Sequence, residues 1–362
     1  MNDSSILPGA GQLIELSGQT DHPDHPYQFI DAPFADSLWH MLELLYASVY
    51  SSRVLLEPLC RHEPRSGVTR AWVERTDGKI STLLLFTQEG PLIRVLNEVL
   101  TLPVSVINRF ASAIFVNHPG AHLVQLHAIV LHRDQTHPRM WCSAFSEDYV
   151  LDLPAQRDAW FSSLSRHSRE KMRYYLRRGF RLQPEMQFTA TFGADIVEDE
   201  VKIVLRQNRQ RMEHKGKTFS MSDAEGVQIC RQMQQVGILF ALRLKGQICA
   251  GLLCSLTGRD LYVHVIAHDP AHNELRPGLL CCCLAIQHAI ELRLARFHFL
   301  WGHYDYKRRL GARAKPLHRL LVPRTAGHLF RHPVHLSRWV AAITRDAARR
   351  WRRPALAGEM SC

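Results

Sequence analysis

The sequence predicts an α/β protein of two similar units, in which each unit is a mixed, mainly antiparallel sheet flanked by helices. The chain has 362 residues, of which 46% are apolar and 22% are charged, so it can bury sizeable cores and is not expected to be disordered throughout. Apolar side chains follow a helical period in some segments and the alternation of strands in others. The order helix, antiparallel strands, loop, helix, strand occurs twice, which favours two related units.

The first unit is expected at residues 27–150, after a polar, proline-punctuated tail at 1–26 that we expect to be flexible. Its clearest feature is Asp77-Gly78, a pair that supplies the positive φ angles of a tight hairpin turn. The elements predicted in this unit are a helix at 34–50, strands at 69–76, 79–86 and 91–97, a helix at 104–115 and a strand at 122–131.

The second unit is expected at residues 151–325 and repeats this order, with a hairpin around Lys245-Gly246. Residues 326–362 predict a basic C-terminal helix. The elements predicted in the second unit are helices at 155–178 and 196–212, strands at 238–244, 247–256 and 261–267, a helix at 278–294 and a strand at 296–301.

The cysteines indicate neither a disulfide framework nor a metal site. Three of the nine, Cys281–Cys283, are consecutive on a predicted helix, where neighbouring side chains diverge by about 100°. They cannot converge on one metal, so we interpret them as small buried hydrophobic residues in a reducing compartment. His268 and His272 have i, i+4 spacing, but Pro270 between them interrupts a helix. We therefore predict no metal.

The stretch from His268 to Gly278 is the most informative, because it joins a strand to a nearly all-apolar helix through a short Pro/Gly loop. Such a loop directs backbone N–H groups and the positive end of the helix dipole at one point, which suits a phosphate or pyrophosphate. The first unit reaches its helix through residues 97–103, which contain no glycine. A net charge of +11 also favours anionic partners. We therefore expect the cofactor in the second unit.

Three residues of this loop carry a resemblance to a known family. Asn273, Arg276 and Gly278 resemble the Gln/Arg-x-x-Gly-x-Gly/Ala pyrophosphate loop of the GNAT acetyltransferases. Asn273 stands where Gln or Arg is usual, and Arg276 stands where glycine is usual. The strands before the loop, and the helix and strand after it, are in the order of the GNAT core.

A second motif, Gly-x-x-x-Tyr-Lys at residues 302–307, directly follows the predicted strand at 296–301, and Gly311 lies four residues further on. It is similar to the signature of the BioF2-like, cellulose-biosynthesis-type branch of the GNAT superfamily, a relative of the Fem-type peptidyltransferases. The resemblance covers roughly residues 150–325. One departure is His298, which stands where the family usually has an acidic residue.

The resemblance implies two tandem GNAT-like units, the first without a cofactor loop, that transfer an acyl group from coenzyme A to an amine. Acetyl-CoA or another acyl-CoA would be the co-substrate. The expected acceptor is an amine such as an amino sugar or another surface-polysaccharide precursor. The residues expected to hold the coenzyme are Asn273, Arg276, Pro277, Gly278 and Leu279.

This chemistry needs a base for the amine, a hydrogen-bond donor for the thioester carbonyl and an acid for the departing thiolate. His264 has an ordinary pKa suited to a base, and we expect it to share one face of its strand with Tyr262 and Ile266. The alternative for His264 is a core histidine satisfied by a neighbour. The catalytic candidates are His264, His303, Asp305 and Tyr306.

Three basic residues are candidates for substrate contact. Lys307 ends the second motif and is expected to contact substrate or a coenzyme phosphate; the alternative is a surface lysine in a basic run. Arg169 lies in a basic helical stripe around Tyr174-Tyr175, for which a solvated helix face is the alternative. Arg209 lies in a segment that resembles the family's substrate side in position.

Two other functions stay open. Fem-type relatives take aminoacyl groups from tRNA, and the positive charge and two basic helices of this chain suit such a donor. A non-catalytic scaffold at the inner membrane face is the third hypothesis, because Arg276 replaces a glycine in the cofactor loop.

The C-terminal helix is expected to place Trp339, Val340, Ile343, Ala347 and Trp351 on one face among arginines. This pattern suits a helix docked on the body or one resting on an acidic membrane. The N-terminus lacks the basic and apolar blocks of a signal peptide, and no uncharged apolar run reaches the ~18 residues of a membrane span. We therefore expect a cytoplasmic protein, with peripheral association at the inner membrane face as a further option.

Overall fold

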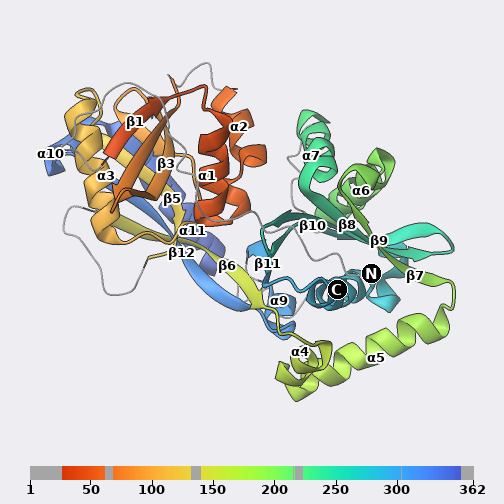
Figure 1. Ribbon diagram of the computed structural model, residues 1–362. Helices are drawn as coiled ribbons and strands as arrows, with labels where there is room; N and C mark the ends of the chain where they lie inside the picture. The colour runs from red at the N-terminus through yellow and green to blue at the C-terminus, as the bar shows by residue number, and fades with distance from the viewer. Residues whose placement is uncertain are drawn as a thin grey trace.

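A single twelve-stranded sheet passes through both halves of the protein and connects them (Figure 1). The structure is a computed structural model that describes residues 27–61, 68–131, 140–214, 216, 223–302 and 304–351. The tail expected at 1–26 lies outside this range. The two halves form two lobes, and two long strands run from one lobe into the other (Figure 1).

The first half contains the predicted elements in the predicted order. It also contains three that were not predicted, the strands Tyr27–Asp31 and Trp141–Asp152 and the helix Arg53–Arg61. The Asp77-Gly78 hairpin is confirmed, since both residues have positive φ angles of 51° and 74°. In chain order the elements are β1 (Tyr27–Asp31), α1 (Asp36–Tyr46), the 3-10 turn η1 (Val49–Ser51), α2 (Arg53–Arg61), β2 (Arg70–Thr76), β3 (Lys79–Glu89), β4 (Leu92–Val95), α3 (Val104–Asn117), β5 (Leu123–Ile129) and β6 (Trp141–Asp152).

The second half repeats the arrangement and adds the C-terminal helices. Its elements are α4 (Arg157–Ser163), α5 (Arg166–Leu182), β7 (Met186–Phe192), η2 (Gly193–Asp195), α6 (Glu198–His214), α7 (Asp223–Val236), β8 (Gly237–Leu244), β9 (Gln247–Thr257), β10 (Asp260–His268), η3 (Pro270–Leu275), α8 (Pro277–Glu291), β11 (Arg296–Trp301), α9 (Asp305–Arg309), β12 (Arg313–Pro323), α10 (Ala326–Arg331) and α11 (Pro333–Trp351).

The two halves have the same topology, which confirms the tandem α/β arrangement. In the first half β1 leads through two helices to β2, β3 and β4, and α3 then joins β4 to β5. In the second half β7 leads through α6 and α7 to β8, β9 and β10, and α8 joins β10 to β11. In each half the pair joined by the last helix is parallel, and the other named strand pairs of the described sheet are antiparallel.

The halves exchange one strand each. The sheet order is β1-β2-β3-β4-β5-β12-β6-β11-β10-β9-β8-β7. Strand β6, which follows β5 in the chain, pairs with β11 of the second half, and β12, which follows β11, pairs with β5 of the first. These two strands also pair with each other in the middle of the sheet. The connection between the lobes is therefore a hydrogen-bonded ladder, not a loose linker.

Separate cores form on the two faces of each half. In the second half, α4, α5 and α8 cover one face, which we call the α8 face, and α6 and α7 cover the other. Cys281–Cys283 lie in the core on the α8 face and are at most 1% exposed. In the first half, α3 covers one face, and α1, α2, α10 and α11 cover the other.

The long helix expected at 155–178 is two helices. Leu164 and Ser165 are extended, and the Ser165 hydroxyl accepts a hydrogen bond from the Ser168 backbone N–H at the start of α5. Serine is a strong N-cap because its oxygen satisfies a backbone donor of the first turn. The break directs α5 along the outer side of the second lobe (Figure 1).

Strand β10 contains a β-bulge at His264, where its pairing with β9 shifts between Val263 and Val265. Before the bulge, Leu261 and Val263 pack in the core on the α8 face. After it, Val265 and Ala267 pack in the core under α6 and α7. One extra residue thus exchanges the two faces of the strand, as a one-residue shift of register does.

The bulge corrects one expectation about the site. The sequence predicted one shared face of the strand for Tyr262, His264 and Ile266. This prediction is wrong, because Tyr262 and Ile266 lie on opposite faces. Ile266 lies on the α8 face, whereas Tyr262 faces a cavity between the lobes. Strict alternation along a strand cannot reveal a bulge, because it assumes that no residue is inserted.

The C-terminal helix α11 docks on the first lobe. Trp339 and Ile343 pack on Leu92, Leu123 and other core residues of the sheet. Val340 is 50% exposed, so the expectation that it shares a face with Trp339 is wrong. The side chain of Trp351 lies outside the described residues. No helix in the described part of the chain combines the length and the apolar character that a membrane span requires.

Candidate functional site

The sheet opens between β10 and β11. Three residue pairs join these parallel strands, Asp260–Arg296, Leu261–Phe297 and Tyr262–His298. Beyond them, no pairing between the two strands is present in the described residues. The edge of β10 that faces β11 is therefore without a strand partner from Val263 on. Because α8 connects the two strands, the start of this helix lies beside the opening.

The start of α8 presents one backbone donor. Arg276 adopts a left-handed conformation (φ 52°, ψ 49°) at the N-cap, and Pro277, which has no N–H, is the first helical residue. The N–H groups of Leu279 and Leu280 bond to the Arg276 carbonyl at 3.0 and 3.1 Å. Among the described residues, none accepts a hydrogen bond from the Gly278 N–H. This donor and the helix dipole are available to an anion.

The left-handed N-cap is a backbone conformation that favours glycine. A side chain in that conformation costs roughly 1–2 kcal/mol, and glycine avoids most of the cost. Arg276 accepts the strain and places a guanidinium at the helix start. Gly278 leaves room for a different neighbour, because an added Cβ would lie 3.1 Å from Nδ1 of His268, which is a tight contact.

A basic cavity of about 150 Å³ lies at this helix start, between α5, α6, α8, α9 and β10. We call it the α8 cavity. Four cationic side chains line it, and one carboxylate faces them. These residues are Lys171, Arg211, Arg276, Arg309 and Asp305.

The α8 cavity brings together five of the residues singled out in the sequence. Of the coenzyme candidates, Arg276, Gly278 and Leu279 line it. Of the catalytic candidates, Asp305 and Tyr306 line it.

Two coenzyme candidates lie beside the cavity and do not line it. The Asn273 side-chain oxygen is 3.0 Å from Nε2 of His268, so the amide supports the histidine that packs on Gly278. Pro277 is buried at the start of the helix core.

The other two catalytic candidates differ in position. His264 lies at the bulge, with Nε2 2.8 Å from the Ser255 hydroxyl. Burial lowers the pKa of His264 to about 4, which keeps it neutral at physiological pH. This environment is that of the core histidine left open as its alternative. His303 lies outside the described residues.

Lys307 is buried, with 2% exposure, and its ammonium donates to three backbone carbonyls. The acceptors are Leu300, Trp301 and Gly302, at 2.9, 3.0 and 3.0 Å. Leu300 and Gly302 both have positive φ, so the lysine holds an irregular turn at the end of β11. Burial lowers the pKa of Lys307 to about 8. In this geometry all three ammonium protons are engaged by the protein.

The remaining substrate candidates lie on helices. Arg169, on α5, donates to the Ser162 carbonyl at 3.4 Å, and Arg209 is exposed on α6. Neither lines the α8 cavity.

A second cavity, of about 560 Å³, lies between the lobes and on the other side of the sheet opening. We call it the interlobe cavity. The first lobe contributes Ser48, Glu74 and Arg109 to its wall, and the second contributes Tyr262 and His298, among others. The ring of Tyr262 stacks on that of His298, with 4.3 Å between centroids.

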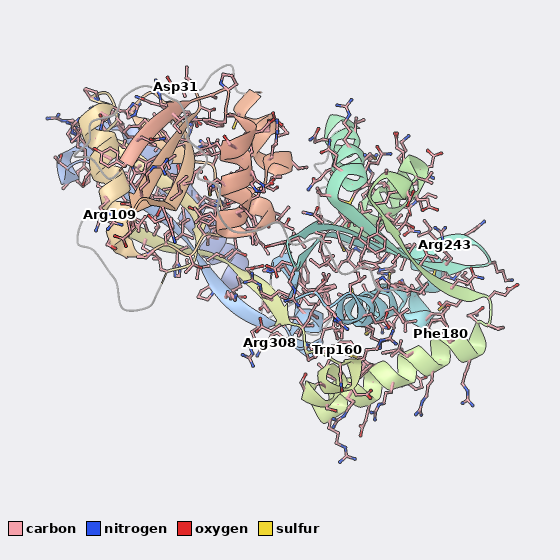
Figure 2. All side chains as sticks on the ribbon, viewed as in Figure 1. Asp31, Arg109, Trp160, Phe180, Arg243 and Arg308 are labelled. Atoms are coloured by element: carbon pink, nitrogen blue, oxygen red, sulfur yellow. The ribbon has the colours of Figure 1, made fainter. Side chains whose placement is uncertain are left out.

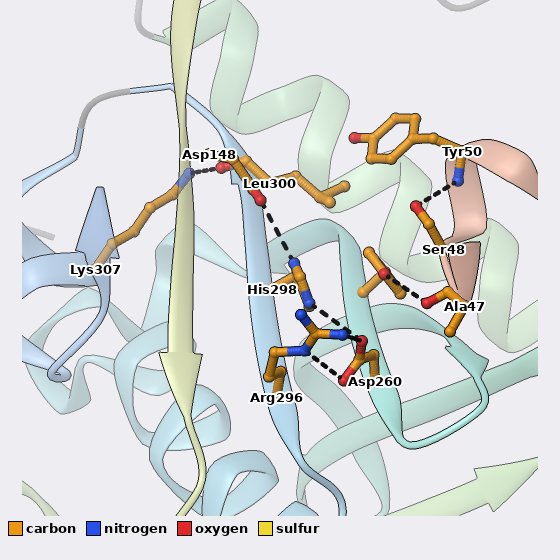
Figure 3. A network of polar contacts seen from close by, with 10 residues as sticks. Ala47, Ser48, Tyr50, Asp148, Asp260, Arg296, His298, Leu300 and Lys307 are labelled. Atoms are coloured by element: carbon orange, nitrogen blue, oxygen red, sulfur yellow. Dashed lines mark hydrogen bonds and ion pairs between the residues drawn. The ribbon is translucent and has the colours of Figure 1, made fainter. Parts of the chain in front are cut away.

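His298 lies between two buried carboxylates at this cavity (Figure 3). Its Nδ1 is 3.5 Å from Asp148, and its Nε2 is 3.8 Å from Asp260. Arg296 pairs with both oxygens of Asp260. Lys307 lies on the far side of Asp148 (Figure 3). The chain of charges therefore crosses β6, β11 and β10 at the point where β10 and β11 separate.

The two carboxylates set the charge of the imidazole. Burial lowers the pKa of His298, but Asp148 and Asp260 raise it by more, so its pKa lies above the ordinary 6.5. Burial raises the pKa of Asp260, and His298 and Arg296 lower it by more, so this carboxyl stays ionised. In the sequence His298 was visible only as a departure from the family pattern, and both aspartates were missed.

Groups of three or more histidine, cysteine, aspartate and glutamate side chains that could hold a metal are absent from the described residues.

Part of the chain is similar to a known family. Residues 166–308 match the family model described as an acetyltransferase (GNAT) domain. A search of curated proteins finds no match.

Three solved structures share the fold over most of the chain. FemX is 11% identical and covers 80% of this chain and 96% of its own, with a TM-score of 0.53. L-PGS from Bacillus licheniformis is 13% identical and covers 81% of this chain and 93% of its own, also with a TM-score of 0.53. A conserved protein of unknown function from Bacteroides thetaiotaomicron VPI-5482 is 10% identical and covers 82% and 100%, with 0.54. Residues 166–308 are therefore similar to a GNAT acetyltransferase domain, and the three structures show that the fold is shared over most of the chain. The assignment to the BioF2-like branch stays a prediction.

Proposed function

We propose that this GNAT-fold protein is an acyl-CoA-dependent N-acyltransferase that binds its donor at the α8 cavity. The observation that carries the proposal is the basic cavity at the start of α8, directly beside the opening between β10 and β11. The phosphates would lie at the helix start, and the thioester would enter the opening. An amine would accept the acyl group, and the resemblance favours an amino sugar or another surface-polysaccharide precursor.

The charges of the cavity support a phosphate-bearing donor. Lys171, Arg211, Arg276 and Arg309 converge with the Gly278 N–H, and charge-assisted hydrogen bonds to phosphate are among the strongest a protein makes. Among the described residues of the wall, Asp305 is the one carboxylate that faces these four cations. An uncharged acyl donor would therefore leave an excess of positive charge in the cavity.

The chemistry follows from the same geometry. The β10 edge has backbone groups without a strand partner, which can hydrogen-bond the thioester carbonyl as negative charge develops on it. Tyr306 lines the cavity and would protonate the departing thiolate. Lys307 holds the turn at the end of β11, which leads into the helix that carries Tyr306. We therefore assign Lys307 a positioning role.

An aminoacyl-tRNA donor is the second candidate, and α5 favours it. Lys171, Arg173, Arg177 and Arg181 are exposed on this helix, which crosses the outer side of the second lobe. Long nitrogen-tipped side chains project from it (Figure 2). A polyanion larger than coenzyme A would contact this surface, and its binding would weaken steeply with salt.

The C-terminal helices supply a candidate membrane surface. Phe330, Val334 and Val340 are 69%, 59% and 50% exposed, and Arg338 and Arg345 of α11 are exposed as well. We extend the proposal to peripheral binding of an acidic membrane by this surface. Co-sedimentation with anionic vesicles, but not with neutral ones, is expected for the wild-type protein. A Phe330→Ser, Val340→Ser variant should lose it.

Ligand-dependent thermal stability tests the donor. Acetyl-CoA or desulfo-CoA at 100 times its Kd should stabilise the protein by about 2.7 kcal/mol, and bulk tRNA should not. Lys171→Glu should abolish the stabilisation, because it reverses a charge in the cavity wall. Arg173→Glu is the matched control, since Arg173 is exposed on the same helix and does not line the cavity.

Each outcome assigns the donor. Stabilisation by coenzyme A that is lost in Lys171→Glu and kept in Arg173→Glu supports the acyl-CoA proposal. Stabilisation by tRNA alone, weakened by both substitutions, supports the second candidate. No response to either ligand contradicts both and favours a scaffold role.

A further inference from the structure

The interlobe cavity and the buried charges at its wall are not used by the donor. This cavity is the larger of the two, and both lobes form it. Its wall contains Asp148 and His298, which are 2% and 5% exposed. Buried polar groups are nearly always satisfied by a partner, so exceptions at a cavity wall point to a ligand.

Two residues of this wall are such exceptions. Oδ1 of Asp148 and both ring nitrogens of His298 have no hydrogen-bond partner among the described residues. The separations from His298 to Asp148 and Asp260 exceed hydrogen-bond length. The Asp260 carboxylate is already held by Arg296, whereas one oxygen of Asp148 is left for another donor.

We propose that the Asp148–His298 pair binds the ammonium group of the acceptor in the interlobe cavity and removes its proton. The inference rests on the proposed acyl-transfer function and assigns it an acceptor side. The donor would occupy the α8 face, and the acceptor would approach from the opposite side of the sheet. The two would meet at the opening where β10 and β11 separate.

The positions of these residues on the sheet support this route. Leu261, Phe297 and Phe299 pack in the core on the α8 face. Tyr262 and His298 alternate with them and therefore face the other way, into the interlobe cavity. The Tyr262–His298 pair is also the last one before the strands part. His298 is thus the residue of β11 nearest to the beginning of the opening on the acceptor side.

The reaction balances with the groups named. The ammonium passes one proton to neutral His298, and the amine lone pair attacks the thioester carbonyl carbon. The N–C bond forms, and the C–S bond breaks on collapse of the tetrahedral species. Tyr306 gives its proton to the departing thiolate, and the second proton of the nitrogen passes through solvent to the tyrosinate, which restores the hydroxyl. The products are an amide, a free thiol and a protonated His298, which returns its proton to water.

Several charged and titratable groups face His298, and together they set its pH dependence. Asp148 approaches from β6, Asp260 and Tyr262 from β10 and Arg296 from β11. On the far side of Asp148 is Lys307, and η1 contributes Tyr50.

The pH profile follows from the position of these groups. The carboxylates raise the pKa of His298 above 6.5, so turnover should rise with pH through a midpoint above that value. Asp148→Asn removes one of these carboxylates and should move the midpoint to lower pH.

The decisive test compares two small nucleophiles with acetyl-CoA as donor. Methylamine is protonated near neutral pH and needs the base, whereas hydroxylamine is already neutral. His298→Gln should lower the rate with methylamine by about 10²- to 10⁴-fold and change the rate with hydroxylamine little. His288→Gln, which removes a half-buried imidazole from the last turn of α8, is the matched control and should change neither rate.

The outcomes separate this inference from the proposed function. Coenzyme A binding by calorimetry reports on the donor side alone and should be equal in wild type and His298→Gln. If the wild-type protein does not bind coenzyme A, the proposed function is contradicted. Intact binding with equal losses for both nucleophiles, or with no loss for methylamine, would overturn the role of His298. Intact binding with no transfer to either nucleophile would overturn it too.

Discussion

The two halves of the sheet contain the same parallel pair of strands joined by a helix, and they differ in the backbone beyond that pair. In the first half, β4 and β5 pair over three residues, and the segment that follows β4 then forms further backbone contacts with the end of β5. The Val99 N–H bonds to the Ala128 carbonyl, the Val130 N–H bonds to Leu100, and Thr101 forms a bridge with Val130. In the second half, β10 and β11 also pair over three residues and then separate.

The cavities beside the two parallel strand pairs also differ. A cavity of about 350 Å³ near β4 and β5 lies under α11, with Trp339 and Arg338 in its wall. The opening between β10 and β11 instead meets a basic cavity at a helix start. One topology thus supports a half whose parallel pair is closed by further hydrogen bonds and a half whose pair opens, and we propose that the open half binds the donor. The difference lies in the backbone hydrogen bonds beyond the parallel pair, which continue in the first half and end in the second.

Breaking the α11 contact should have the largest effect on the first half. Asp346 of α11 pairs with Arg319 of β12 at 2.9 Å, and both side chains are buried. Asp346→Ala should lower the free energy of unfolding by about 3 kcal/mol, because it leaves a buried guanidinium without its carboxylate. Urea unfolding measures it, with the exposed Arg345→Ala as control. A loss below about 1 kcal/mol, or a change in coenzyme A binding, would contradict the separation of roles.

Removing the acid of the second half should lower turnover by about 10²-fold. Tyr306→Phe deletes the hydroxyl expected to protonate the thiolate and keeps the ring. The acyl-transfer rate should fall while the affinity for coenzyme A stays constant. Tyr174→Phe, at an exposed tyrosine of α5, should leave both unchanged. Equal rates for Tyr306→Phe and wild type would remove the tyrosine from the mechanism.

Lys307→Met should destabilise the protein by about 2 kcal/mol, because three carbonyls lose a shared donor in a buried site. Thermal unfolding measures the loss. The neighbouring Arg308 is exposed, so Arg308→Met should cost less than about 0.5 kcal/mol. If Lys307→Met keeps full stability but loses coenzyme A affinity, the lysine contacts the ligand directly and the positioning role is wrong.

The smallest effect is expected on α5. Arg173→Glu combined with Arg177→Glu should leave the Kd for coenzyme A within about twofold, since neither residue lines the α8 cavity. Calorimetric titration measures this Kd. A large loss would show that the donor extends over α5, as the tRNA alternative requires.

Most of the fold could be predicted from the sequence, because it depends on local patterns. The hairpins at Asp77-Gly78 and Lys245-Gly246 follow from positive φ angles that the structure shows. The repeated element order indicated two related units. Strands β6 and β12 were not among the predicted elements. Their exchange between the halves could not be predicted, because pairing between distant strands has no local signal. The break between α4 and α5 was missed, although Ser165 is a local N-cap signal.

The candidate site could be predicted only in part. The loop before α8 was visible as a Pro/Gly turn ahead of an apolar helix, and the structure brings Arg276, Gly278 and Tyr306 together there. The Asp148–His298 contact joins residues 150 positions apart in the sequence, so no spacing rule could find it. The bulge at His264 was equally hidden, because one inserted residue leaves the apolar pattern of β10 almost unchanged.

The matched starts of α3 and α8 give the most direct test of the central claim. Ser105 and Gly278 both occupy the second position of their helix, one in each half. Coenzyme A is titrated calorimetrically into wild type, Ser105→Trp, Gly278→Trp and Leu279→Trp, with each variant first checked for cooperative unfolding. We predict that Ser105→Trp binds as wild type does and that the two α8 variants lose binding. Binding that survives at α8 and is lost at Ser105 would place the ligand in the other half and contradict this assignment.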